Sequence, residues 1–571
     1  MAFKVTPSDR MLGLLLALFF VSSLILSAGV PDMYNSPDER AAAVSIEAFI
    51  RDNHFSVSEP LNPEFGGVLA PRSMVSAPRQ GSGQVGDSLV PITFPGLPLF
   101  YGIVGKAMSF PLTKFLTPLL AVLAVLAWRK TLESFLSRRA SLIASILLLT
   151  LAGFWFYSAR AFMHNVPFLA FLIFGFFFLS RKGFRPRDAI LAGLMFGLAL
   201  LFRTSEIVWM SLVGLVFLVA FVRKIRFKPL ALFLAALVIG LSPLFFWNQA
   251  HFGSSWQFGY TVSAPVFSPP KLSEPLPAKI VASPPSRAML SQMLFPFGFH
   301  PRTAWKNFVD YQLELTWWMT GLAVLGLVFL VMGSGLDFGH SPKSTKSRPD
   351  PKICTFAKIC TMPKMLRAIL LATFFAGGYL TFLYGSWNII DNPDPGVVTL
   401  ANSYVRYWLP IYLVSTIPAA LFIEWLAGRA RTLLSQRLVI GSVLLLVSAL
   451  SIRLVFFHPD DGLVRTRAVL FESIEIRDEL LARTQPESVI IVDYADKILF
   501  PHRRVVVPLR SQATYDALPS IVERLPTYYY GITLPESDLD HLNQEILSPR
   551  GLTAEPITTI NIETLYRIHT L

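Results

Sequence analysis

The sequence predicts an all-α polytopic membrane protein with a small extracytoplasmic α/β domain at its C-terminus, on the strength of three observations. Of 571 residues, 53% are hydrophobic and only 15% are charged, whereas about 25% of the residues in a soluble domain are charged. The apolar residues form blocks of about 15 to 23 residues, close to the length that a helix needs to cross a bilayer. After the last block, short β-branched runs predict strands.

The apolar blocks predict about 11 transmembrane helices. The first block, Met11–Val30, is longer than the roughly 7–15-residue core of a signal peptide, so we favour an uncleaved anchor over a cleaved leader. The blocks at 189–202 and 206–222 are short for separate spans, and the count depends on them. The predicted spans are 11–30, 111–128, 140–157, 166–180, 189–202, 206–222, 229–247, 313–333, 368–385, 407–426 and 438–456.

Basic residues indicate how the spans are oriented. About 30% of the residues in alternate gaps are Lys or Arg, against about 9% of the whole chain, and cytoplasmic loops collect these residues. The basic segments are 1–10, 129–139, 181–188, 223–228, 334–367 and 428–437. We therefore expect a multi-pass protein of the plasma (inner) membrane with a cytoplasmic N-terminus. The spacing of Cys354 and Cys360, inside 334–367, fits neither a CxxC pair nor a zinc site and predicts free thiols.

The chain thus divides into an anchor (1–30), an outer loop (31–110), a helical bundle (111–457) and a tail domain (458–571). The bundle carries a further outer loop at 248–312 and the cytoplasmic loop 334–367. In the tail, Ser488–Val492 and Arg504–Val507 are expected strands and Pro535–Ile546 an expected helix, while Tyr528–Tyr530 is expected as an exposed or edge strand. The formal net charge of +13 is accompanied by no zinc-finger or RNA-binding motif, so nucleic acid is not an expected partner.

The first outer loop carries an adjacent acid pair, Asp38 and Glu39. Ser36 and Pro37 before them predict a helix that begins here, with Glu39 at the capping-box position. Helix capping alone explains Pro37 and Glu39. It explains less well two carboxylates directly outside a span, where such groups can accept a proton or bind a cation.

Three solitary arginines, Arg160, Arg203 and Arg406, each lie near a span end on the same predicted outer face. The planar fork of a guanidinium matches phosphate oxygens, so the three would suit an anionic lipid headgroup. The alternative is that each side chain snorkels along its helix to water with no special partner.

The order of the motifs resembles the GT-C superfamily of integral-membrane glycosyltransferases. The acid pair is followed by Pro95-Gly96-Leu97-Pro98-Leu99-Phe100-Tyr101-Gly102, by Ser158-Ala159-Arg160 and by Arg406-Tyr407-Trp408-Leu409-Pro410. Over residues of about 10 to 430, the sequence is similar to the branch of polyprenyl-phosphate-mannose protein mannosyltransferases and lipid A aminoarabinose transferases. The resemblance implies a hexosyl or pentosyl transferase of the cell envelope that uses a polyprenyl-phosphate-linked sugar in the membrane, with inversion and an acceptor still to be identified.

The resemblance also implies roles for individual residues. Asp38 would be the catalytic carboxylate, and Glu39 would assist it or help to hold a divalent cation. Arg406 is the first candidate for the lipid phosphate, ahead of Arg160 and Arg203. The other expected substrate-binding residues are Tyr407, Arg72 and a second acid, for which Asp87 and Glu206 stay open. We expect His164 and His251 to be interfacial residues rather than metal ligands or proton shuttles.

A lipid or glycolipid transporter would share the spans and the basic loops. Such a protein typically places charged or Gly/Pro-broken positions near the bilayer centre and has internal pseudo-symmetry. Here the ionisable groups cluster at span ends on one face, which favours surface chemistry. A non-catalytic scaffold that presents the tail would leave Asp38 and the arginines without a role.

Overall fold

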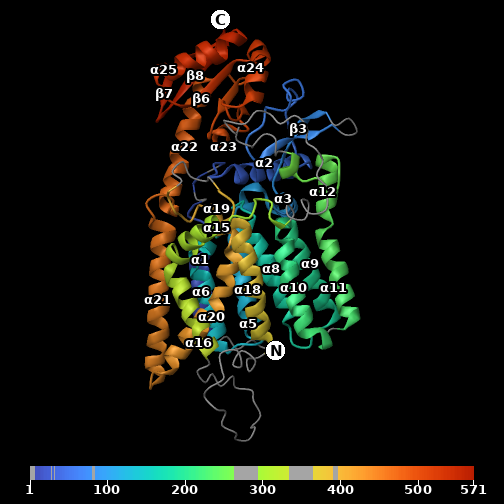
Figure 1. Ribbon diagram of the computed structural model, residues 1–571, viewed down its shortest axis with the longest axis vertical. Helices are drawn as coiled ribbons and strands as arrows, with labels where there is room; N and C mark the ends of the chain where they lie inside the picture. The colour runs from blue at the N-terminus through green and yellow to red at the C-terminus, as the bar shows by residue number, and fades with distance from the viewer. Residues whose placement is uncertain are drawn as a thin grey trace.

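The computed structural model describes residues 7–26, 29–30, 32–79, 84–224, 226–262, 294–332, 364–389 and 396–571. A long helical bundle carries a layer of loops, strands and short helices at one end, and the C-terminal domain lies above that layer (Figure 1). The N-terminus lies at the opposite end of the bundle. The predictions for Cys354, Cys360 and most of 334–367 fall outside the described residues, as does the middle of 248–312.

The predicted apolar blocks overlap helices, although in the first block, 11–30, the helix ends at Ser23. The helices of the bundle are α1 (Pro7–Ser23), α4 (Phe110–Thr113), α5 (Leu116–Leu132), α6 (Arg138–Thr150), α7 (Ala152–Ser158), α8 (Asn165–Leu179), α9 (Pro186–Phe202), α10 (Ile207–Phe221), α11 (Phe227–Leu241), α12 (Pro243–Phe252), α15 (Pro301–Phe308), the π-helix η3 (Val309–Glu314), α16 (Trp317–Met332), α18 (Lys364–Gly385), α19 (Ser403–Tyr407), α20 (Leu409–Gly428) and α21 (Leu433–Phe457).

In the described part of the chain, six helices are long and apolar enough to cross a membrane, or up to eight if each of two bent pairs is one span. One bent pair is α6 with α7, at 57°, and the other ends in α16, at 95°. α8, with 15 residues, is short for a span, and α1 and α9 have 17 residues each. The protein is therefore a multi-pass membrane protein, and the count of about 11 spans stays a prediction.

The first outer loop folds onto the end of the bundle around α2 (Pro37–Asp52). Ser36 caps this helix by accepting a hydrogen bond from the backbone N of Asp38 at 3.1 Å, which confirms the predicted helix start. The alanines at 41–43 are buried. The loop also contains β1 (Val57–Ser58), β2 (Met74–Pro78), β3 (Val85–Pro91) and α3 (Gly96–Met108), and the strands form an antiparallel sheet in the order β1-β3-β2.

The helix α22 (Leu463–Arg483) leads from the bundle into the C-terminal domain (Figure 1). Its five-stranded sheet has the order β5-β4-β6-β8-β7, with β5, β4 and β6 parallel and the other pairs antiparallel. The elements are β4 (Val489–Val492), α23 (Asp496–Leu499), β5 (Arg504–Val506), α24 (Gln512–Arg524), β6 (Thr527–Ile532), α25 (Glu536–His541), the π-helix η4 (Leu542–Leu547), the 3-10 helix η5 (Ser548–Arg550), β7 (Leu552–Ile560) and β8 (Glu563–Thr570). The two predicted strands and the predicted helix are confirmed.

The expectation for Tyr528–Tyr530 is wrong, because these residues lie in β6, an inner strand, and are buried. Their rings are accommodated because polar atoms inside the domain meet their hydroxyl groups. The hydroxyl of Tyr529 donates to Asp493 Oδ2 at 2.9 Å, and that of Tyr530 donates to the carbonyl of Ile560 at 3.2 Å. A tyrosine run therefore marks the centre of this sheet rather than its edge.

The first outer loop and the C-terminal domain share a hydrophobic core. Phe65 and Leu69 of the loop belong to the same buried cluster as Val489 and Ile491 of β4. Burial of apolar surface between two segments resists their separation. The two outer parts therefore pack together above the bundle.

Candidate active site

Asp38 lies in the first turn of α2, at the junction of the bundle and the outer layer. Its Oδ1 accepts a hydrogen bond from the hydroxyl of Ser73 at 2.6 Å. Its Oδ2 lies 3.7 Å from Nη1 of Arg406, and 27% of the Asp38 side chain is exposed. One carboxylate oxygen is thus held in place, while the other faces a cation across a gap longer than a hydrogen bond.

Arg406 comes from α19, the short helix that precedes α20 at the same end of the bundle. Its Nη2 donates to the hydroxyl of Ser403 at 2.7 Å, and its guanidinium carbon lies 5.2 Å from the ring centroid of Tyr407. These contacts fix the direction of the guanidinium, whose Nη1 also lies 3.7 Å from Asp38 Oδ2. A guanidinium held in this way has the donor geometry that anionic oxygens bind.

Arg203, at the end of α9, is held much more firmly than Arg406. Its Nε donates to Glu206 Oε1 at 2.7 Å, and its Nη2 donates to the hydroxyl of Tyr384 at 2.9 Å. The guanidinium carbon also lies 4.7 Å from the ring centroid of Tyr407. Arg203 thus supports Tyr407 and contributes a fixed charge beside Arg406.

Gly96 allows the first outer loop to approach Arg203. A Cβ atom at this position would lie 2.5 Å from the backbone N of Phe202, at the end of α9. Only glycine permits so close an approach of two backbones. The preceding Phe94 can then place its ring 5.9 Å from the guanidinium carbon of Arg203, which gives the Pro-Gly motif a physical role.

These side chains surround one cavity, which we call the Asp38 cavity. It is partly open to solvent and contains about 260 Å³ of space between its side chains. Its acid and its arginines come from α2, from the end of α9 and from α19, segments far apart in the sequence. The residues that line it are Asp38, Phe94, Met163, His164, Asn165, Arg203, Tyr260, Arg406 and Tyr407.

His164 is a buried member of the Asp38 cavity. Neither of its ring nitrogens has a hydrogen-bond partner among the described residues. Burial lowers the pKa of His164 to about 3, Asp38 opposes this shift, and Arg203 and Arg406 add to it. The imidazole is therefore neutral near pH 7. His251 differs, because its Nδ1 lies 3.0 Å from the carbonyl oxygen of Trp247 and its ring packs on that indole.

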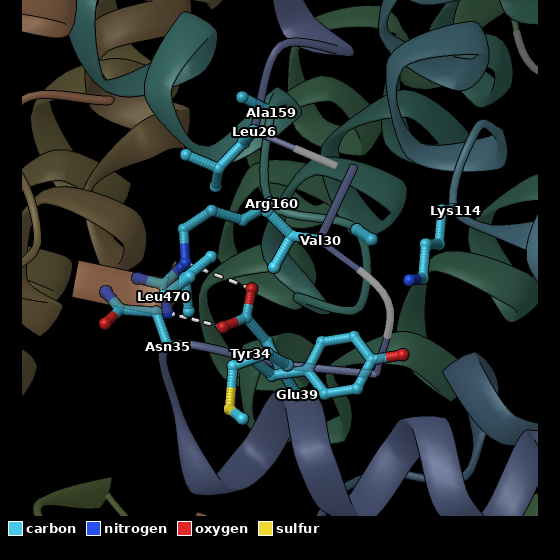
Figure 2. A pocket seen from close by; sticks show the side chains of 11 residues that line it. Leu26, Val30, Tyr34, Asn35, Glu39, Lys114, Ala159, Arg160 and Leu470 are labelled. Atoms are coloured by element: carbon cyan, nitrogen blue, oxygen red, sulfur yellow. Dashed lines mark hydrogen bonds and ion pairs between the residues drawn. The ribbon is translucent and has the colours of Figure 1, made fainter. Parts of the chain in front are cut away.

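Glu39 enters a second cavity, which we call the Arg160–Glu39 cavity (Figure 2). Its carboxylate accepts hydrogen bonds from Arg160 Nη2 at 2.7 Å and Nε at 3.1 Å, and each side chain is only 4% exposed. Successive residues of an α-helix project about 100° apart. This rotation separates the neighbours Asp38 and Glu39.

The second cavity is lined by charged and apolar side chains, is partly open to solvent, and contains about 340 Å³ of space between them. Figure 2 shows Lys114 and the Tyr34 ring on one side of the ion pair. The amine of Lys114 lies 5.4 Å from that ring centroid. The lining is Leu26, Val30, Met33, Tyr34, Asn35, Glu39, Lys114, Ala159, Arg160, Ala161 and Leu470.

The remaining predicted residues lie in different surroundings. Glu206 pairs with Arg203 at the Asp38 cavity and also accepts a hydrogen bond from the Tyr384 hydroxyl at 2.7 Å. Asp87 is exposed on β3 and lines neither cavity. Arg72 donates from Nη2 to Asp496 of the C-terminal domain at 2.6 Å. Of Asp87 and Glu206, the two candidates for a second acid, only Glu206 contacts a residue of the Asp38 cavity, namely Arg203.

Sequence reasoning did not select Ser73, Phe94, Asn165 or Tyr260 as site residues. Asn165 Nδ2 donates to the carbonyl of Arg406 at 3.1 Å, and its place between Arg160 and an apolar block was a usable signal. Ser73 has a left-handed φ of 59°, which no local motif predicts. In the described ranges, no group of three or more His, Cys, Asp or Glu side chains could hold a metal ion, and the expected divalent cation stays a prediction.

No family model matches the sequence, and no curated protein matches it. Solved structures do match. The chain aligns with ArnT from Cupriavidus metallidurans bound to undecaprenyl phosphate at a TM-score of 0.54 and 10% identity, covering 98% of this chain and 97% of that one. With the same protein in the apo state, the TM-score is 0.53 and the identity 11%, over 98% of both chains.

The chain has the ArnT fold. The resemblance to GT-C glycosyltransferases is thereby confirmed for the architecture. The archaeal oligosaccharyltransferase AglB from Archaeoglobus fulgidus, in complex with an inhibitory peptide and a dolichol-phosphate, also aligns, at a TM-score of 0.45 and 12% identity over 94% of this chain and 70% of that one. This second likeness is too weak to extend the argument.

Proposed function

We propose that the protein is a glycosyltransferase that moves a sugar from a polyprenyl-phosphate donor to an acceptor hydroxyl at the extracytoplasmic face of the membrane. One observation carries the proposal. A partly exposed carboxylate, Asp38, shares a cavity at the end of a membrane bundle with the guanidinium of Arg406, 3.7 Å away. The first group can take a proton and the second can receive a phosphate.

In the proposed reaction, Asp38 Oδ2 accepts the proton of the acceptor hydroxyl. That oxygen bonds to the anomeric carbon as the bond from this carbon to the phosphate oxygen breaks, and the lipid phosphate leaves with the electron pair. Arg406 stabilises the negative charge that develops on the leaving oxygen. A single displacement inverts the anomeric configuration.

The tight pairs take other roles in this proposal. Glu39 and Arg160 satisfy each other by two hydrogen bonds, so we assign them to holding α2 against the loop after α7. Arg203 and Glu206 hold Tyr407 and Tyr384 around the cavity. Glu206 is our choice for the second acid, because Asp87 is remote from the cavity.

The membrane setting supports a lipid-linked donor. ArnT, which shares the fold, has been crystallised with undecaprenyl phosphate. The basic gaps support an extracytoplasmic position for the cavity, and we assign the chain to the plasma (inner) membrane. The transferred group is a hexose or a pentose.

The test is turnover by the purified full chain. A panel of polyprenyl-phosphate sugars is supplied with candidate protein and lipid acceptors, and release of the free lipid phosphate is measured. Asp38→Asn should lower turnover about 10²- to 10⁴-fold, the usual contribution of a general base. Asp52→Asn is the matched control, because Asp52 lies at the other end of α2 and pairs with the exposed Arg51.

Two results would overturn the proposal. If Asp38→Asn turned over at the rate of the unsubstituted protein, Asp38 could not be the general base. Movement of the lipid between vesicle leaflets with the sugar-phosphate bond intact would instead identify a transporter.

A further inference from the structure

The C-terminal domain contacts the first outer loop at several places, and one of them, the segment 496–500 with α23, meets the residues next to Asp38. Figure 1 shows α23 at the base of that domain, beside the outer layer, and α23 contacts α2. Neither Asp496 nor Lys497 lines the Asp38 cavity. They nevertheless contact residues adjacent to Ser73 and Ser36, the two serines that bind Asp38.

The first contact is an ion pair between Asp496 and Arg72. The buried Asp496 carboxylate accepts hydrogen bonds from the backbone N of Arg72 at 2.9 Å, from Nε at 3.0 Å and from Nη2 at 2.6 Å. Both the backbone and the side chain of Arg72 are therefore fixed. The next residue, Ser73, supplies the hydroxyl that holds Asp38 Oδ1.

The second contact is made by Lys497. Its Nζ donates to the carbonyl oxygen of Asn35 at 2.8 Å. Asn35 precedes Ser36, whose hydroxyl accepts from the backbone N of Asp38. Lys497 thus fixes the peptide group between Asn35 and Ser36. Ser36 is the N-cap of α2 and binds the backbone N of Asp38.

A third contact fixes α2 one turn further. The carbonyl of Phe500 accepts from Arg40 Nε at 2.5 Å, and Arg40 Nη1 donates to the carbonyl of Asp32 at 2.8 Å. Arg40 is only 4% exposed. The segment 496–500 therefore holds the chain just before α2, at Asn35, and the end of its first turn, at Arg40.

We infer that Asp496 and Lys497 are positioning residues for the carboxylate of Asp38, so that the C-terminal domain is part of the catalytic apparatus. The inference rests on the proposed function of Asp38. A displacement of about 1 Å at a reacting group can lower a rate about 10²-fold. Contacts that fix both flanks of Asp38 therefore act on the rate without touching the substrate.

The contact of Lys497 is sensitive to pH. Burial lowers the pKa of Lys497 to about 8; nearby Arg72 and Arg160 add to the shift, and Asp496 and Glu39 oppose it. A hydrogen bond from a charged donor is roughly twice as strong as one from a neutral donor. The bond to Asn35 should therefore weaken as the pH rises through about 8.

The experiment compares Lys497→Met, Lys497→Arg and Asp496→Asn with the unsubstituted full chain. Lys106→Met is the matched control, because Lys106 is an exposed outer-face lysine bonded to Asn53. Hydrogen exchange of peptides that cover residues 34–45 reports the order of α2 independently of turnover, and kcat and KM for the donor report its effect.

The expected result is a fall in kcat of about 10- to 100-fold for Lys497→Met and Asp496→Asn, with KM changed less than about 3-fold, because the substrate contacts remain. Exchange of residues 34–45 should rise in both variants and not in Lys106→Met. Lys497→Arg should keep kcat close to that of the unsubstituted chain. We expect the unsubstituted chain to lose activity between about pH 7 and 9, and Lys497→Arg should not, because a guanidinium stays protonated there.

Unchanged exchange at residues 34–45 in both Lys497→Met and Asp496→Asn would overturn the inference, whether or not the protein transfers sugar. Unchanged kcat in folded Lys497→Met would overturn it as well. Failure of the proposed function looks different, since the unsubstituted chain would then turn over no donor while the exchange differences persist.

Discussion

Asp38 and Glu39 are neighbours in the chain, yet they enter cavities of opposite character. In the Arg160–Glu39 cavity, both partners are 4% exposed and joined by a two-pronged hydrogen bond. In the Asp38 cavity, the acid is 27% exposed, the arginine is 14% exposed, and 3.7 Å separates their nearest atoms. The first pair is bound too tightly to exchange partners, whereas the second can admit a ligand between its charges.

The largest expected effect concerns the Arg160–Glu39 pair. Arg160→Met leaves the buried Glu39 carboxylate without its hydrogen-bonded cation, which should lower the free energy of unfolding by about 3–5 kcal/mol. The double variant Glu39→Leu with Arg160→Met should recover much of this loss, because both charges of the pair are then removed. Thermal unfolding of the purified protein measures both. An Arg160→Met variant that is as stable as the parent but no longer binds polyprenyl phosphate would instead make Arg160 a ligand-binding residue.

Substitutions in the Asp38 cavity should change the affinity for the lipid phosphate more than the stability of the protein. Arg406→Lys loses the planar fork and should weaken binding of sugar-free undecaprenyl phosphate about 10-fold, or about 1.4 kcal/mol. Arg429→Lys is the control, because Arg429 also packs on an aromatic ring, that of Trp425, but follows the far end of α20. If Arg406→Lys and the parent bound undecaprenyl phosphate with equal affinity, Arg406 would not be the phosphate-binding residue, and Arg203 would be the next candidate.

The Asp38 cavity should also give the protein an acid sensitivity through His164. Its pKa is about 3 in the folded protein, against about 6.5 in an unfolded chain. Between these values the unfolded chain binds more protons, so stability is full above pH 6.5 and falls as the pH decreases toward 3. His164→Gln should show a flatter decline of the unfolding temperature between pH 7 and 5. Parallel declines would contradict the assignment.

The smallest effect is expected outside both cavities. Asp87→Asn should change the free energy of unfolding by less than about 0.5 kcal/mol, because Asp87 is exposed, and it should leave turnover unchanged. Glu206→Gln removes the charge that pairs with Arg203 and should lower turnover. A loss of turnover in Asp87→Asn alone would reverse our choice between these two acids.

The helices and their polarity could be predicted from the sequence because both depend on local composition. The apolar blocks overlap helices, and the start of α2 follows from Ser36 and Pro37. The C-terminal strands β4 and β5 were predictable from β-branched runs. Tyr528–Tyr530 was misassigned because its burial depends on Asp493 and the neighbouring strands.

The grouping of the charged residues was predicted only in part. The sequence placed Asp38 and three arginines on one face, and the structure brings Arg203 and Arg406 to the Asp38 cavity. Arg160 pairs instead with Glu39. Which acid meets which arginine depends on a rotation of about 100° between successive residues of α2. The spacing of residues in the sequence does not show which arginine packs against each face of this helix.

By itself, the sequence determined that this chain is a membrane bundle with an acid at the start of an outer helix, because hydrophobicity and helix capping act over a few residues. Only the tertiary structure decided that Arg406 faces Asp38 and that Asp496 and Lys497 hold the loop around it. Those contacts join segments hundreds of residues apart, and they form only after the bundle, the outer loop and the C-terminal domain have packed against one another.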